Sequence, residues 1–199
     1  MKKPIGVILV AFCLIAIGAL VYFKFFKDNF YGVLRERPVG DFILSAHTGR
    51  ETAFSDFEGK AVVVFFGYTS CPDICPTTLS ILAQVGEHLG KYKDEVQFIF
   101  ISVDPKRDSL EKLGEYVKYF DEDFMGLTGS NDQLSLAARE FWVSWEVERV
   151  ENAGMEYLIG HTSSIFVVSP ERDRYLKFSH LQSDPVLIAK DIKKLIRGF

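Results

Sequence analysis

The chain has 199 residues, of which 48% are hydrophobic and 14% aromatic, and it shows no repeat, so one folded domain with a short appendage is expected and a solenoid is excluded. Four basic residues and no acidic ones lie in the first 27 positions, so residues 28–199 hold 19 basic and 27 acidic side chains. That excess of acidic groups, about −8 in formal charge, argues against a nucleic-acid partner and against a polybasic lipid-binding patch.

Residues 4–23 form an unbroken run of uncharged, mostly apolar side chains. At 1.5 Å per residue, a helix of this length reaches about 30 Å, the thickness of a bilayer's hydrocarbon core. The run therefore predicts a single transmembrane anchor, with residues 1–3 as its cytoplasmic end. A cleaved signal peptide is the alternative, but its apolar region is normally about 7–15 residues and ends in a small-x-small site, which Ala16-Ile17-Gly18 matches weakly. Cys13, in mid-span, is interpreted as a packed thiol.

The segment after the anchor is polar and charged, and we interpret residues 24–39 as a juxtamembrane linker. The folded domain is then expected over residues 40–199. Its first part, residues 40–59, alternates loosely and contains Gly49 and Gly59 as turn points, which is typical of an edge hairpin ahead of the core.

Strand-like and helix-like runs alternate along the rest of the chain. The run 61–66 is apolar and rich in β-branched residues, which predicts a strand buried on both faces at the centre of a sheet. This alternation predicts an α/β layered fold. The expected elements after this strand are a further buried strand at 96–103, helices at 76–92, 108–120, 133–141 and 185–197, and extended segments at 143–150, 156–159 and 164–168.

The segment Cys71-Pro-Asp-Ile-Cys75 lies at the turn between the first buried strand and the helix that follows. If the chain is helical from Cys71 onward, residues four apart share a face, so the two sulfurs lie close enough for a common ligand or a disulfide. The N-terminus of the helix favours the thiolate form. Two thiolates suit Cu(I) or Zn²⁺ but leave a divalent site incomplete, so a third ligand is expected elsewhere in the chain.

Four histidines are candidates for that third ligand. His47 lies in the predicted hairpin, His88 on the outer part of a helix and His180 near the end of the last strand, and each is interpreted as a surface or hydrogen-bonded histidine. His161 differs, because it lies in a predicted turn just before the strand 164–168, where it can face the cysteines.

Asp104 ends the second buried strand, at the edge of the sheet where ligand sites of open α/β folds gather. A role beside the metal and a role as a turn carboxylate before Pro105 both remain open for it.

Three segments in this order resemble the Sco/SenC family, which comprises membrane-anchored, thioredoxin-like copper proteins of cytochrome c oxidase assembly. The resemblance extends from about Gly40 to the C-terminus, and it implies a thioredoxin-like fold. Its segments are Gly-Tyr-Thr-Ser-Cys-Pro-Asp-Ile-Cys-Pro at 67–76, Ser-Val-Asp-Pro-Lys-Arg-Asp at 102–108, and Tyr-Leu-Ile-Gly-His at 157–161 leading into Ile-Phe-Val-Val-Ser-Pro at 165–170.

The resemblance implies that Cys71, Cys75 and His161 are the copper ligands and that Asp104 and Asp108 shape the site around them. Asp108 has a second explanation, because it also fits the cap of the helix that follows.

The sequence departs from the family pattern at two positions. Ser70 and Gly160 stand where the family usually shows His and Asp. These departures put the fine tuning of the site in question more than its set of ligands.

By the same resemblance, the expected function is delivery of copper, as Cu(I), Cu(II) or both, to the copper-containing subunit of cytochrome c oxidase, and another extracytoplasmic copper acceptor remains open as the partner. Oxidation of the cysteine pair would remove two ligands, so a thiol reductant protein is an expected partner. The short basic N-terminus lacks an Arg- and Ser-rich leader, which favours the bacterial inner membrane, single-pass, with the soluble domain on the periplasmic side.

The main alternative is an extracytoplasmic thiol-disulfide oxidoreductase that keeps partner cysteines reduced, with Cys71 attacking and Cys75 resolving. It ranks second because such enzymes usually have two residues between their cysteines, and this chain has three. A peroxiredoxin is weaker, since its Pro-x-x-x-Thr-x-x-Cys arrangement is absent around both cysteines. A purely structural disulfide would close only a short loop and would stabilise the fold little.

Overall fold

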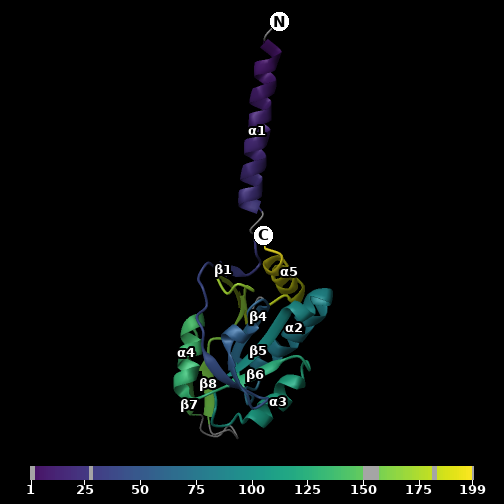
Figure 1. Ribbon diagram of the computed structural model, residues 1–199. Helices are drawn as coiled ribbons and strands as arrows, with labels where there is room; N and C mark the ends of the chain where they lie inside the picture. Colours follow the sequence, from purple (N-terminus) through teal and green to yellow (C-terminus); the bar gives the residue numbers. More distant parts are fainter. Residues whose placement is uncertain (1–2, 27–28, 150–156, 181–182, 199) are drawn as a thin grey trace. The chain divides into compact units, whose positions relative to one another are not determined.

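The computed structural model describes residues 3–26, 29–149, 157–180 and 183–198 (Figure 1). The chain divides into two compact units, Met1–Phe30 with Phe199, and Tyr31–Gly198. The domain therefore begins at Tyr31 rather than at the predicted residue 40.

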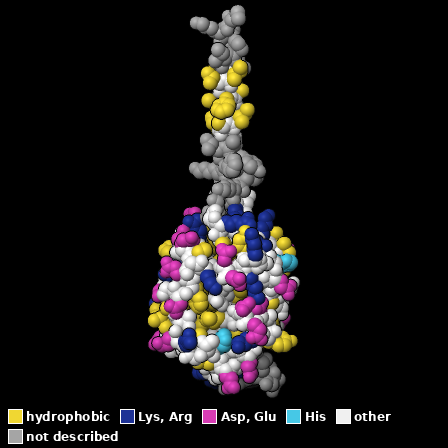
Figure 2. All heavy atoms as spheres, turned by 45° about the vertical axis from the view of Figure 1, so that its right-hand side comes forward, with side chains coloured by type: hydrophobic (Ala, Val, Ile, Leu, Met, Phe, Trp, Pro, Cys, Tyr) yellow, Lys and Arg dark blue, Asp and Glu magenta, His cyan; other side chains and the backbone are white. Residues whose placement is uncertain are grey.

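The first unit contains one helix, α1, over Lys3–Phe26. The large apolar side chains that the structure describes between Ile8 and Ile17 are 56–71% exposed, and they contribute to the yellow band in Figure 2. The predicted helix over 4–23 is confirmed. Within the described part of the chain, no helix is both long enough and apolar enough to span a bilayer, so the structure does not show the predicted transmembrane anchor.

The second unit is built on an eight-stranded sheet with the order β1-β10-β9-β4-β5-β6-β2-β3. β4 pairs in parallel with β5 and β5 with β6, while the other pairs are antiparallel. All seven residues of β4 are buried, which confirms the predicted central strand. The strands are β1 Val33–Arg35, β2 Ile43–Ala46, β3 Glu51–Ala53, β4 Ala61–Gly67, β5 Val96–Ser102, β6 Met125–Thr128, β9 Ser164–Val168 and β10 Tyr175–Ser179.

Helices cover both faces of this sheet. The parallel connections β4-α2-β5 and β5-α3-β6 advance in the same direction across the sheet, so right-handed crossovers place α2 and α3 on one face. α5 packs against α2, and α4 lies on the other side (Figure 1). The helices are α2 Ile74–Leu89, α3 Leu110–Lys118, α4 Asn131–Phe141 and α5 Pro185–Ile196, with short 3₁₀ helices η1 Phe54–Phe57 and η2 Gly90–Glu95.

Successive β4 side chains point to opposite faces, and this alternation builds two parts of the core. Phe66 joins an aromatic cluster under α4, and burying each phenylalanine stabilises the fold by about 1.5–3 kcal/mol. Phe65 points the other way, and its ring centroid lies 6.1 Å from that of His161. The cluster, with centroids 4.8–6.3 Å apart, is Phe42, Phe54, Phe66, Phe141, Phe166 and Tyr175.

A separate antiparallel hairpin carries the candidate histidine. It consists of β7, Trp145–Arg149, and β8, Tyr157–His161, and it forms its own two-stranded sheet. Trp145 pairs with His161, so the histidine ends a strand rather than lying in the predicted turn. Both predicted extended segments are confirmed where the structure describes them, and the part of the prediction that falls on residues 150–156 lies outside the described residues.

The edge hairpin predicted for residues 40–59 is confirmed as β2 and β3, joined through Gly49 at a φ of 83°. Within the predicted juxtamembrane linker, residues 24–39, Val33 to Arg35 form β1 and pair with Tyr175 to Lys177 of β10. A three-residue strand with alternating exposed and half-buried side chains, whose partner is distant in sequence, has no local signal.

Candidate metal centre

The cysteine pair lies between the end of β4 and the first turn of α2. The helix begins at Ile74, so Cys75 is in its first turn and Cys71 lies in the preceding loop. Cys75 is completely buried and Cys71 is half-buried, and no disulfide joins them. The backbone N–H of Cys75 donates to Cys71 Sγ over 3.5 Å. Helix-start N–H groups stabilise a thiolate, so the loop supports the charge that metal binding needs.

His161 completes a group of three donor atoms. Its Nε2 lies 3.4 Å from Cys75 Sγ, and the donor atoms of Cys71, Cys75 and His161 all lie within 4.8 Å of one another. His161 Nδ1 lies 3.2 Å from the carbonyl oxygen of Thr162. Because a carbonyl only accepts, Nδ1 carries the proton, and the lone pair of Nε2 points toward the sulfurs.

The two thiols share a proton unequally. A hydrogen bond from Cys75 lowers the pKa of Cys71 to about 3 against the effect of burial, and hydrogen bonds from the backbone N–H groups of Asp73 and Cys75 act in the same direction. The same hydrogen bond, with burial, raises the pKa of Cys75. The reduced pair therefore holds one thiolate and one thiol at neutral pH, and a bound metal would replace the shared proton.

Gly67 is a residue of the site that the sequence analysis missed. A Cβ atom at this position would lie 2.7 Å from Cys75 Sγ and 2.8 Å from the ring of Phe100. The end of β4 passes so close to the sulfur that only glycine fits without a shift.

Asp104 connects β5 to the hairpin that carries His161. Only 3% exposed, it forms an ion pair with Arg107 and accepts a hydrogen bond of 2.7 Å from the hydroxyl of Tyr157. The guanidinium of Arg107 lies 3.7 Å from the ring centroid of Tyr157 and donates to its carbonyl oxygen over 2.8 Å. Asp104 is therefore more than a turn carboxylate, because it holds the start of β8.

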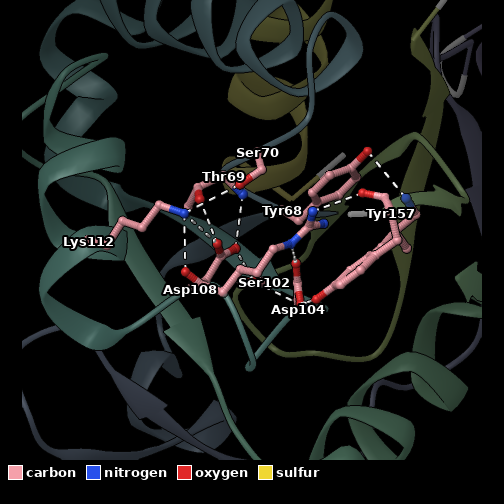
Figure 3. Close-up of polar contacts among 10 residues, drawn as sticks. Tyr68, Thr69, Ser70, Ser102, Asp104, Asp108, Lys112 and Tyr157 are labelled. Carbon is pink, nitrogen blue, oxygen red and sulfur yellow. Dashed lines mark hydrogen bonds and ion pairs between the residues drawn. The ribbon is translucent and has the colours of Figure 1, made fainter. Parts of the chain in front are cut away.

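Asp108 supports the cysteine loop instead of capping a helix. It is 1% exposed, and its carboxylate accepts from Thr69 N over 2.9 Å and from Ser102 Oγ over 2.6 Å (Figure 3). The helix-capping interpretation of Asp108 is wrong, since Ser109 is the N-cap of α3 and accepts from Lys112 N. This buried carboxylate fixes the backbone of Thr69 close to Cys71.

Tyr68 joins the two halves of the centre. Its hydroxyl accepts a hydrogen bond of 3.3 Å from Ile159 N in β8, and its ring meets that of His161 edge-on at 5.9 Å. The loop with the cysteines and the strand with the histidine are thus held together directly. Neither Tyr68 nor Arg107 belongs to a spacing pattern that marks it in the sequence, although both lie inside the segments that carried the family resemblance.

The other three histidines lie elsewhere, as expected. His47 Nδ1 accepts from Gly126 N over 3.1 Å, and His180 Nδ1 shares a hydrogen bond of 2.7 Å with Ser163 Oγ. His88 is exposed in the last turn of α2. Among the described residues, Cys71, Cys75 and His161 form the one group of His, Cys, Asp or Glu side chains placed to hold a metal.

The centre opens to solvent on one side. A cleft of about 310 Å³ lies between the cysteine loop and the hairpin, and both Cys71 and His161 line it together with Ile74 and Glu148. A ligand or partner group can therefore approach Cys71 and His161, while Cys75 stays buried beneath them.

The fold and the site together define a thioredoxin-like protein with a Cys-Cys-His metal centre. The defining features are a mixed sheet of this order, a cysteine pair where a central strand meets a helix, and a histidine that faces the pair. Residues 34–197 match the family model described as SCO1/SenC. The chain belongs to the SCO1/SenC family, which confirms the resemblance seen in its sequence.

The relatives agree with this assignment. A SCO2-like protein from Rickettsia felis is 34% identical over 159 residues, which cover 80% of this chain and 75% of that protein. The crystal structure of Arabidopsis thaliana ScoI with copper bound is 32% identical, with a TM-score of 0.73, over 80% of this chain and 98% of that one. The solution structure of apo Sco1 from Thermus thermophilus is 38% identical, with a TM-score of 0.70, over 83% and 95%.

Proposed function

We propose that this protein binds copper through Cys71, Cys75 and His161 and delivers it to the copper site of a cytochrome c oxidase subunit. The observation that carries the proposal is the meeting of two sulfurs and one imidazole nitrogen within 4.8 Å. Thiolates select soft ions such as Cu(I), and imidazole suits copper in either oxidation state. The copper bound in the Arabidopsis relative and the membership of this chain in the SCO1/SenC family support the proposal.

The unequal exposure of the ligands suggests how the ion is passed on. Cys71 and His161 line the open cleft, whereas Cys75 is completely buried. An acceptor's ligand that enters the cleft meets Cys71 first, so exchange begins at that sulfur and Cys75 is the last to release the ion. The Asp104 and Asp108 contacts keep the loop and the hairpin in place during the exchange.

Oxidation of the pair is incompatible with this function. Loss of two electrons and of the one shared proton joins the sulfurs in a disulfide and removes two of the three ligands. We therefore include a thiol reductant protein among the partners of this chain.

We further propose that α1 anchors the protein in the bacterial inner membrane as a single span, with the second unit on the periplasmic side. The support is the uncharged apolar run at residues 4–23 of the sequence, of which the structure describes only some of the side chains. The periplasm is also where a dithiol that must be kept reduced meets an oxidising environment.

A thiol-disulfide oxidoreductase is the second candidate. A half-buried Cys71 of low pKa next to a buried Cys75 is the arrangement of an attacking and a resolving thiol. Copper delivery ranks first because His161 Nε2 contacts Cys75 Sγ directly, and disulfide exchange has no need of that third donor.

The test is copper stoichiometry on the reduced, detergent-solubilised chain, under anaerobic competition with a Cu(I) chelator. The wild type should retain about one copper, and His161→Ala should lose it. His180→Ala is the matched control, since that histidine lies outside the centre, and it should bind as the wild type does. A wild type that cannot compete for Cu(I) would place the oxidoreductase first.

A further inference from the structure

The hairpin presents two glutamates beside the metal centre. Along β7, Glu146 and Glu148 share a face because side chains alternate along a strand. Glu148 lines the cleft together with Cys71 and His161, whereas Glu146 lines only a neighbouring hollow, which it shares with Glu148 and His161. Glu148 is therefore the carboxylate that shares a cavity with two of the three donors.

Gly160 makes room for this carboxylate. A Cβ atom built on Gly160 would lie 3.3 Å from Glu148 Oε1, so the carboxylate occupies the space next to the residue that precedes His161. Pairing of the hairpin places Glu146, rather than Glu148, opposite Gly160, so Glu148 reaches across diagonally.

Glu148 is also free to turn. Its side chain is exposed, and among the residues that the structure describes it has no hydrogen bond and no ion pair. Because no ordered contact has to be broken, a rotation of this side chain toward the cleft costs little beyond its rotamer entropy.

The two oxidation states of copper differ in what they need from this cleft. Cu(I) is satisfied by a few soft ligands, which Cys71, Cys75 and His161 supply. Cu(II) prefers four ligands in a tetragonal arrangement and accepts nitrogen and oxygen donors. A carboxylate also attracts a divalent ion more strongly than a monovalent one.

We propose that Glu148 supplies an oxygen ligand to Cu(II) in this centre and leaves Cu(I) to the two cysteines and the histidine. The inference rests on the proposed copper site. Glu148 is outside the group of atoms within 4.8 Å, so binding requires its side chain to turn into the cleft. Its consequence is that Glu148 stabilises the oxidised ion and lowers the reduction potential of the centre.

The test compares Glu148→Gln with Glu146→Gln in the detergent-solubilised chain. Glu148→Gln should change the Cu(II) electron paramagnetic resonance spectrum and weaken Cu(II) binding about tenfold, with Cu(I) affinity unchanged, which corresponds to a potential about 59 mV higher. Glu146→Gln, on the same face but outside the cleft of Cys71, should match the wild type in all three measurements. Adding Gly160→Asp to Glu148→Gln should restore a carboxylate beside His161 and recover the wild-type spectrum.

Two results would overturn the inference. One is a Glu148→Gln variant whose Cu(II) spectrum and affinity equal those of the wild type. The other is an equal loss in Glu146→Gln, which would show a general effect of surface charge rather than a ligand. Failure of the wild type to bind Cu(I) would instead refute the proposed function, so the two failures are distinguishable.

Discussion

Asp108 gives the sharpest test of how the fold supports the centre. Its carboxylate accepts hydrogen bonds from Thr69 N and Ser102 Oγ, and Lys112 Nζ lies 3.4 Å away. In Asp108→Ala these two donors and Thr69 Oγ1, which also donates to the carboxylate, lose their acceptor inside the protein, and each buried donor without a partner costs about 1–3 kcal/mol. The Lys112 side chain is 45% exposed, so its ion pair adds little. We expect a loss of about 3 kcal/mol in the free energy of unfolding.

Urea unfolding of the second unit measures this loss, with an unchanged m-value as the condition for comparing midpoints. Asp108→Asn keeps the shape and one acceptor oxygen, so its loss should be smaller, about 1–2 kcal/mol. Asp73→Ala removes an exposed carboxylate from the same loop and should change stability by at most about 0.5 kcal/mol. Because Thr69 is close to Cys71, Asp108→Ala should also weaken Cu(I) binding by at least about tenfold. A destabilisation below about 1 kcal/mol would contradict the assignment of these hydrogen bonds.

Three further predictions concern the centre itself. Gly67→Ala should displace Cys75, destabilise the fold by about 1–3 kcal/mol in urea unfolding and weaken Cu(I) binding in chelator competition. Wild-type stability together with wild-type Cu(I) binding would refute the close approach of β4 to Cys75 Sγ. Tyr157→Phe should remove one hydrogen-bond donor from buried Asp104 and cost about 1–3 kcal/mol in the same unfolding assay. An unchanged free energy of unfolding would show that the hairpin does not depend on the hydrogen bond between Tyr157 and Asp104. Since the pKa of Cys71 lies near 3, the rate of its alkylation by iodoacetamide in the metal-free protein should hardly change between pH 5 and 8. In Cys75→Ser the rate should fall with decreasing pH. A tenfold fall in rate per pH unit in the wild type would contradict the shared proton.

The elements that could be predicted from sequence are those whose signal is local. The run 61–66 is apolar throughout because β4 is buried on both faces. The four-residue spacing of the cysteines predicted that their sulfurs lie close together, although the structure places Cys71 in the loop before α2 rather than on a face of the helix. His161 was identified as a candidate from its place before the strand 164–168 and as a ligand from the family resemblance. The structure adds that its Nε2 meets Cys75 Sγ.

The parts that sequence patterns missed depend on contacts between distant residues. β6 was not predicted, because a strand of four residues is too short to show a hydrophobic periodicity in the sequence. Its place in the sheet comes from pairing in parallel with β5 and antiparallel with β2. Asp108 looked like a helix cap because the pattern around it fits one, yet burial against Thr69 and Ser102 decides its role. The pairing of Arg107 with Tyr157 is likewise invisible before the hairpin is folded onto β5.

The separate sheet formed by β7 and β8 has a thermodynamic consequence. One ligand of the centre comes from the loop before α2, one from the first turn of α2 and one from the end of β8, so a bound ion links the hairpin to the body of the domain. Any local opening that swings β8 away must first release the ion, and its free energy therefore rises with copper occupancy by RT ln(1 + [Cu]/Kd). The copper-loaded and the copper-free protein thus differ in how often the hairpin opens away from the domain. A partner that recognises the closed hairpin would distinguish the two forms without contacting the metal.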